Sequence, residues 1–328
     1  MTRVRIDPYD LLGLGLGAAL IAWICVTAAA RIGNPLTQVA VLVLASAAYL
    51  IGRTVGGRRP VFVAAVVVAA ILAGTVLSGP AAITGGPLAP PLGYANANGA
   101  LYTLGAAAAS IVAVAANKNT VRQPAAMLAI VMAALAAFTG SKAAITLSLG
   151  VLAVALFCRA LGRWVALFAP LVVAGAVATT VVLGLTHGTA AFPRLVEGLT
   201  DRRTELWQDA LDIISAEPVF GVGPGMFARI SPTALGDADA VWAHSAYLQV
   251  GAEHGIPGAL LLGALLLWVF GALYRSRQNP RVIVIGVAAS TAFAIHAAID
   301  YVAHFPAVVL VAALIAGLAS SLGIKTSE

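Results

Sequence analysis

The chain has 328 residues, of which 61% are apolar and 10% are charged, and its mean hydropathy is +0.97. These values exclude a soluble globular domain, in which about 45–50% of residues are apolar and ~25% are charged. The formal net charge of +6 is spread over short loops and forms no basic stripe, so no nucleic-acid partner is expected. The composition predicts an integral membrane protein.

Apolar stretches about as long as a membrane span recur along the chain. A helix needs about 20 residues to cross the hydrocarbon core, and lipid cannot satisfy free backbone groups, so these stretches must be helices. The residue alternation typical of a transmembrane barrel is absent. The fold is therefore predicted to be all-α and polytopic, with about ten transmembrane helices, near residues 11–30, 36–52, 61–78, 96–116, 124–139, 143–158, 164–186, 256–274, 282–299 and 305–322.

The first stretch is expected to remain as a span, because it lacks a convincing cleavage site and further spans follow at once. Cys25 and Cys158 both fall within expected spans, so neither a disulfide framework nor a thiolate metal site is expected. A single integral membrane domain is predicted over residues 1–328. With the N-terminus in the cytoplasm, most of the 19 Lys and Arg residues fall in cytoplasmic loops, and the positive-inside rule then places both termini there.

The longest expected loop, residues 187–243, lies outside the membrane between the seventh and eighth spans. Loops of this length in compact proteins are usually functional. Residues 200–216 are expected to form an amphipathic helix that Thr200 or Asp201 caps and that Pro218 ends. Trp207 suits a helix lying at the membrane interface.

On that helix, Arg202 shares a face with Glu205 and Asp209, whereas Arg203 shares its face with Trp207. Arg203 is therefore aimed at the apolar side, in the first turn, where backbone N–H groups also favour an anion. Two interpretations remain open: Arg203 contacts a phosphate group, or it snorkels along the interface.

The segment GVGPGM, residues 221–226, follows the amphipathic helix. No strand precedes it and no Lys-Ser/Thr follows it, so it matches neither the dinucleotide fingerprint nor the P-loop. A structural turn is expected here.

The segment AHSAYLQVGAEHGIPG, residues 243–258, puts titratable groups beside the eighth span. If one helix starts at His244, Gly251 lies on the same face and leaves room beside the imidazole, while Glu253 lies roughly opposite. A neutral imidazole at the membrane rim can accept a proton from a hydroxyl group; a structural role is the alternative. Glu253 is expected to tie the following turn to a neighbour, and His254 is expected to be solvated.

Further polar groups lie near the expected outer rim. Asn96 and Asn98 open the fourth span, where they can cap the helix or hydrogen-bond a ligand, with capping favoured. Lys142 sits in a tight outside turn, as a functional cation or as a snorkelling side chain.

The residues His296, Asp300 and His304 recur at intervals of four and would align on one helix face. This spacing resembles a metal pair, but few other ligands accompany it. Hydrogen bonds between packed helices are therefore preferred over a zinc site.

Three motifs follow one another in and after the long loop: RTELW at 203–207, EPVFGVGPGMF at 217–227, and HSAYLQ at 244–249 with EHG at 253–255. In this order they resemble the Arg-x-x-x-Trp, Pro-x-x-Gly-x-Gly-x-Gly-x-Phe and His-Asn/Ser-x-x-Leu…Glu-x-Gly motifs of the Wzy_C superfamily of O-antigen ligases and polymerases. Outside the loop, YANAN at 94–98 and SKA at 141–143 fall where the family places an asparagine-containing motif and a Ser-Arg-Gly motif.

The resemblance implies a metal-independent, inverting glycosyltransferase of the GT-C type at the outer face of the bacterial plasma membrane, without a cofactor. The implied partners are a glycan donor on a polyprenyl diphosphate, normally undecaprenyl diphosphate, an acceptor hydroxyl on a glycolipid, a glycan or a protein, and membrane lipid. Family ligases often have around twelve spans, more than the ten expected here, and Ser245 stands where an asparagine is common.

The resemblance also implies residue roles. Arg203 would bind the diphosphate and stabilise the departing charge, and His244 would orient or deprotonate the acceptor hydroxyl. Lys142 stands in place of a family arginine, so it keeps the charge but loses the bidentate fork. The residues expected to bind substrate are Lys142, Arg229, Asn96, Asn98 and Tyr247.

The sequence does not distinguish a ligase from a polymerase, because both enzymes use the same donor chemistry. The rival from another class is a flippase for lipid-linked glycans or a small-molecule transporter. Transporters usually show two related halves with helices broken near the midplane. No internal repeat is visible in this sequence, and its charged residues cluster at the expected outer rim. A structural scaffold is a third interpretation.

Overall fold

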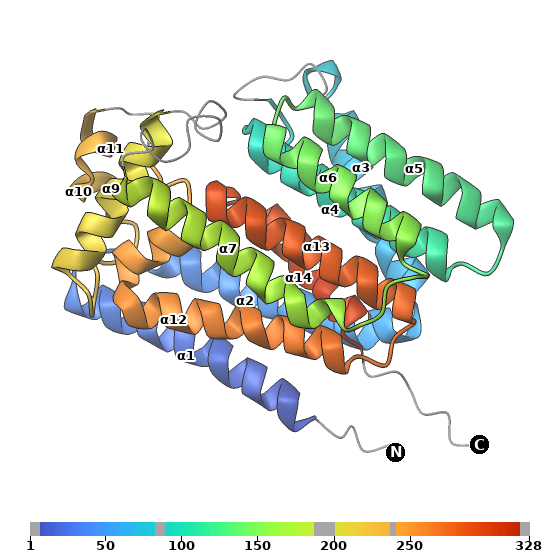
Figure 1. The fold of residues 1–328 in the computed structure, drawn as a ribbon, viewed down its shortest axis with the longest axis horizontal. Coiled ribbons are helices and arrows are strands. Elements are labelled where there is room, and N and C mark those ends of the chain that lie inside the picture. The colour runs from blue at the N-terminus through green and yellow to red at the C-terminus, as the bar shows by residue number, and fades with distance from the viewer. Residues whose placement is uncertain (1–6, 83–88, 187–200, 237–240, 322–328) are drawn as a thin grey trace. The chain divides into compact units, whose positions relative to one another are not determined.

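The computed structural model describes residues 7–82, 89–186, 201–236 and 241–321. Every regular element in these ranges is a helix (Figure 1). The all-α, polytopic fold predicted from the sequence is therefore confirmed.

Eight helices of the described residues are long and apolar enough to span a membrane. They are α1 (Pro8–Ala30), α2 (Leu36–Ile51) with the π-helical η1 (Gly52–Gly56), α3 (Pro60–Leu77), α4 (Ala95–Ala115), α5 (Asn119–Phe138), α7 (Val165–Leu185), α12 (Ala246–Arg275) and α13 (Pro280–Ile299). Two more apolar helices, α6 (Lys142–Phe157) and α14 (Pro306–Ala319), are shorter. All ten expected spans are thus apolar helices, but two of them fall short of full span length.

Five short elements complete the described fold: η2 (Pro80–Ala82), α9 (Asp201–Ala216), α10 (Phe227–Ile230), α11 (Pro232–Gly236) and η3 (Val302–His304). The chain divides into two compact units. Unit 1 comprises Met1–Ser46 and Gly175–Ala272, and unit 2 comprises Ala47–Ala174 and Leu273–Glu328. The single domain expected over 1–328 stays a prediction.

In unit 1, α1 lies alongside α12 (Figure 1). Tyr9 stacks on Trp268 with ring centroids 6.1 Å apart, and each side chain donates a hydrogen bond to the other residue's carbonyl. Gly13 and Gly271 make this approach possible, because a Cβ on either would overlap the partner ring system. At the other end of these helices, α7, α9, α10 and α12 enclose a small core that includes Leu183, Trp207 and Leu248.

In unit 2, α4 is the central helix and packs against α3, α5, α6, α13 and α14. Its sequence is rich in Ala, Gly and Ser, which let neighbouring helices approach closely. A Cβ on Gly99 would lie 2.5 Å from the Cβ of Ala144, and one on Gly105 would lie 2.9 Å from the sulfur of Met132. Helix α4 is therefore buried by protein along most of its length, as is α13, whereas the other six candidate spans are mostly exposed on the protein surface.

Candidate active site

Helix α9 is the amphipathic helix expected from the sequence, and its apolar face packs against protein. Leu206, Trp207 and Ala210 are fully buried in the core of unit 1. The backbone of α7 comes close at Gly184, where a Cβ would lie 3.2 Å from that of Trp207. Neighbouring helices cover this face, so the ring of Trp207 is buried by protein, and the predicted position of α9 at the membrane interface stays a prediction. Thr200, one of the two expected caps, is outside the described residues.

Trp207 joins the first and third sequence motifs. Its indole N–H donates a hydrogen bond to the carbonyl of His244 at 3.2 Å. Arg203 lies one helical turn before Trp207 and is half-buried. The spacing of four in RTELW therefore puts the candidate phosphate ligand on the same side of α9 as the residue that anchors His244.

His244 has an unusual backbone conformation. Its φ of 48° lies in the left-handed region, and His244 is the one described non-glycine residue with positive φ. For an L-residue this conformation costs about 1–2 kcal/mol, and such residues cluster at functional sites. The bond from Trp207 and the packing around it hold the strained backbone in place.

The helix expected to start at His244 is a wrong prediction, because α12 begins at Ala246. The Ser245 hydroxyl accepts a hydrogen bond from the N–H of Leu248 at 3.4 Å, in the manner of an N-cap. His244 therefore precedes the helix. Gly251 leaves no room for substrate either: a Cβ there would lie 2.7 Å from Ile214, so this glycine allows α9 to pack against α12.

The glycine-rich segment at 221–226 hydrogen-bonds to backbone carbonyls that are left unpaired where helix α12 is broken. Helix α12 is interrupted at Gly255, whose φ is 68° and ψ is −175°. Pro257 has no N–H for the carbonyl of Glu253, and the N–H of Ile256 donates instead to Pro218 at 2.8 Å. The carbonyls freed on α12, those of Ala252 and Glu253, accept from the N–H groups of residues 222 and 223, both at 2.9 Å.

The turn conformation itself depends on glycine. Gly221, Gly223 and Gly225 have φ values of 59°, 97° and 73°. A Cβ on Gly221 would lie 2.5 Å from the carbonyl oxygen of Ala252. The structural turn expected from GVGPGM is confirmed, and its function is to satisfy the backbone of the interrupted helix.

Glu253 is fully buried and ties the glycine-rich turn at 221–226 to its surroundings, whereas the prediction concerned the turn at 255–258. Its carboxylate accepts from the side-chain amides of Gln38 and Gln249, both at 2.7 Å. The backbones of Gly225 and Phe227 also hydrogen-bond to it. One carboxylate with several donors thus stabilises the geometry of the turn.

His254 was expected to be solvated, and that prediction is wrong. It is 1% exposed, with Nδ1 2.8 Å from the Thr27 hydroxyl and Nε2 2.9 Å from Oε1 of Gln38. The close approach of α1 and α2 within unit 1 buries it. Trp23 of α1 reinforces the contact, because its indole N–H donates to the His254 carbonyl at 2.8 Å.

The other charged groups of unit 1 differ in what they contact. Arg202 lies 3.9 Å from the carboxylate of Glu205, as expected for their shared face. Asp209 instead accepts hydrogen bonds from the Ser231 hydroxyl and from the N–H of Thr233 at 3.0 Å, which fixes the start of α11 to α9. Arg229 is exposed on α10.

Unit 2 holds the other expected substrate ligands. Asn98 is fully buried, and its amide donates to the carbonyl of Ala89 at 2.7 Å and accepts from the N–H of Leu92 at 3.1 Å. It therefore orders its own loop. Neither Asn96 nor Asn98 caps α4, whose N-cap is Tyr94.

Asp300 forms a polar cluster that sequence reasoning missed. Its carboxylate accepts from the Tyr94 hydroxyl at 2.9 Å and from the Asn96 amide at 2.6 Å. Tyr94 also stacks on Tyr301, with ring centroids 4.4 Å apart. No local signal in the sequence joins residues so far apart along the chain.

The alignment expected for His296, Asp300 and His304 is wrong, because α13 ends at Ile299 and Asp300 is already extended. The spacing of four residues therefore extends past the end of α13, where it no longer places side chains on one helix face. Within the described ranges, no three or more His, Cys, Asp or Glu side chains gather in a way that could hold a metal ion.

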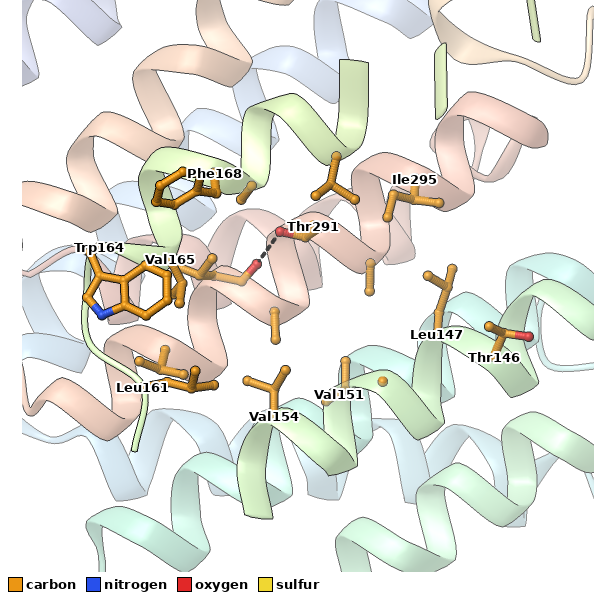
Figure 2. Close-up of a pocket in the computed structure, with 17 residues that line it drawn as sticks. Thr146, Leu147, Val151, Val154, Leu161, Trp164, Val165, Phe168, Thr291 and Ile295 are labelled. Carbon is orange, nitrogen blue, oxygen red and sulfur yellow. Dashed lines mark hydrogen bonds between the residues drawn. The ribbon is translucent and has the colours of Figure 1, made fainter. Parts of the chain in front are cut away.

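Lys142 is the exposed first residue of α6, directly after the N-cap Ser141. A cation at a helix N-terminus is disfavoured by the helix dipole, by about 0.3–1 kcal/mol. One turn further along α6, Thr146 lines an apolar pocket of about 320 Å³ between α6, α7 and α13 (Figure 2). Unit 2 thus combines an exposed cation with a nearby space for hydrocarbon.

In unit 1, Arg203 lies one turn before Trp207, which hydrogen-bonds to the His244 carbonyl. Tyr247 is half-buried at the start of α12, and Arg229 is exposed on α10. Residues 126–263 match the family model described as O-antigen ligase, Wzy_C. This region of the chain matches the O-antigen ligase family. The matched region includes Lys142 and all three motifs, whereas Asn96 and Asn98 precede it. A search of curated proteins found no match.

Proposed function

We propose that the protein is an O-antigen ligase-type glycosyltransferase of the bacterial plasma membrane, which moves a glycan from a polyprenyl diphosphate to an acceptor hydroxyl. The observation that carries this proposal is the strained backbone of His244, held by Trp207 of the same helix that bears Arg203. A residue kept in the left-handed region by its neighbours is typical of a site where side-chain direction matters more than local stability.

The proposed reaction is one displacement. The acceptor oxygen attacks the anomeric carbon, the bond from that carbon to the diphosphate oxygen breaks, and the hydroxyl proton passes to the imidazole of His244. The diphosphate leaves with its electron pair, and Arg203 stabilises the added negative charge. The configuration at the anomeric carbon inverts, and the step requires no metal ion.

Lys142 is proposed as a second diphosphate contact, with the hydrocarbon chain of the donor in a membrane-embedded apolar groove. The exposed ammonium group at the start of α6 supports this assignment, as does the apolar pocket that begins one turn away. Tyr247 and Arg229 are proposed to contact the glycan. Asn98 is not proposed as a substrate ligand, because its amide hydrogen-bonds to the carbonyl of Ala89 in its own loop.

Substitutions in cells distinguish this proposal from a flippase. His244→Ala and Arg203→Ala should each lower surface glycan at least tenfold and raise polyprenyl-linked precursor on the outer face. Arg202→Ala is the matched control, since it removes a neighbouring exposed arginine on the face away from Trp207. Precursor trapped on the cytoplasmic face would indicate a flippase, and unchanged glycan in both variants would indicate a scaffold.

A further inference from the structure

A second cavity of unit 2 lies at the opposite end of α6 from Lys142. It is bounded by the end of α4, the start of α5 and the end of α6, and its volume is about 700 Å³. That volume falls within the ~300–1,000 Å³ typical of small-molecule sites. Apolar side chains such as Ala126 and Ile130 of α5 and Leu152 and Leu156 of α6 line most of it.

One end of this cavity is polar. Asn119, Arg122 and Gln123, from the first turns of α5, line it there. Arg122 is half-buried, and its Nε donates to the carbonyl of Ala113 at 3.3 Å, which fixes the guanidinium at the cavity. A guanidinium has five N–H donors, so this bond leaves others for an acceptor.

In the part of the chain that the structure describes, this arginine has no ion-pair partner. No acidic residue occurs between Asp10 and Glu197 in the sequence. Asp300, the acidic residue of unit 2 that the structure describes, accepts hydrogen bonds from Tyr94 and Asn96. Among the described residues, no carboxylate forms an ion pair with Arg122.

Further positive charge gathers at the same end of the helices. Lys118 directly precedes α5, whose first turn has no acidic residue, and Arg159 and Arg163 follow α6. Cations beside a helix N-terminus are unfavourable unless an anion is also present. A half-buried arginine at the polar end of an apolar groove, in a unit poor in carboxylates, fits an amphiphile with an anionic head.

We propose that this cavity binds one anionic membrane phospholipid, with the phosphate beside Arg122 and one acyl chain in the apolar groove between α5 and α6. Basic pockets between transmembrane helices bind anionic head groups in this way. The polar end, residues 119–123, precedes the Wzy_C match at 126–263, whereas the apolar lining at 126–156 lies within that match. The cavity contains no residue of the three motifs at 203–255. On the proposed orientation it faces the cytoplasm.

Native mass spectrometry of the full-length protein, purified from bilayers of equal phosphatidylglycerol and phosphatidylcholine with identical acyl chains, tests this proposal. The wild type should retain one phosphatidylglycerol in preference to phosphatidylcholine. Arg122→Gln, which removes the charge, should lower that retention at least fivefold. Arg59→Gln, at an exposed arginine of unit 2 outside the cavity, should retain as much as the wild type.

A second variant tests the same cavity in case Arg122→Gln misfolds. Ala126→Phe fills the apolar groove and leaves Arg122 in place, so it should also lower retention of phosphatidylglycerol. Equal retention of the two lipids by the wild type, or full retention by both cavity variants, would overturn the proposal. Displacement of the lipid by an equal concentration of inorganic phosphate would also overturn it, since the site would then bind a free anion.

Discussion

At His244, a strained backbone and a candidate catalytic side chain coincide. The φ of 48° is unfavourable for an L-residue, and the carbonyl is held by Trp207 at 3.2 Å. The sequence predicted the importance of His244 through its motif. It did not predict the conformation, because apolar periodicity suggested a helix that started at His244. The hydroxyl of Ser245, which can cap a helix, was the local signal for a start at Ala246.

Glycine at position 244 should increase the stability of the protein and remove its activity. His244→Gly relieves the left-handed strain and should raise the free energy of unfolding by about 0.5–1 kcal/mol, measured by thermal denaturation in detergent. It should also remove transferase activity. His244→Asn keeps a residue that tolerates this conformation, so it should lose activity without that gain. A lower free energy of unfolding for His244→Gly than for the wild type would contradict the inference that the His244 backbone is strained.

At the scale of elements, the glycine-rich turn and the interrupted helix α12 form one structural unit. Their order in the sequence predicted a turn next to a span, but not that residues 222 and 223 donate to carbonyls freed by Gly255 and Pro257. The burial of His254 and Trp207 was also unpredictable. Both depend on helices from distant parts of the chain, and the hydropathy of a single segment does not reveal its neighbours.

Two alanine substitutions in the turn should differ in severity. Gly225→Ala adds a Cβ where no atom lies within 4 Å, so it should cost only the strain of positive φ, about 1 kcal/mol. Gly221→Ala adds the same strain and a contact of 2.5 Å with the carbonyl of Ala252, so it should cost about 2 kcal/mol or more in addition. Equal loss of folded protein in detergent would contradict this role of Gly221.

At the scale of the molecule, hydropathy predicted the helices well because lipid imposes one solution on long apolar segments. The predicted ends differ from the observed ones by a few residues, and the span predicted to start at 256 begins directly after the kink at Gly255. A separate helical segment of α12, which begins at Ala246, precedes that kink. Length was predicted less well only for the last span, because α14 ends at Ala319 and has 14 residues. Helix α6, which follows the N-cap Ser141, has 16 residues, the length that its predicted span has.

The orientation proposed from loop charges can be tested by labelling. In a chain with Cys25 and Cys158 replaced by alanine, cysteine at the exposed position 229 should react with a membrane-impermeant maleimide added to whole cells. Cysteine at the exposed position 59 should react only after the cells are opened. The opposite pattern would place the loop motifs in the cytoplasm, away from an outside acceptor.

Glycan transfer by the purified protein is the direct test of the proposed glycosyltransferase activity. The wild type, incubated with a polyprenyl diphosphate glycan and candidate acceptors, should form a glycosylated acceptor with inverted anomeric configuration, in the presence or absence of EDTA. A single product indicates a ligase and a ladder indicates a polymerase. His244→Asn and Arg203→Ala should each reduce the rate at least 100-fold, about 2.7 kcal/mol in the barrier, while Arg202→Ala stays near wild type. Full activity of His244→Asn would contradict the account.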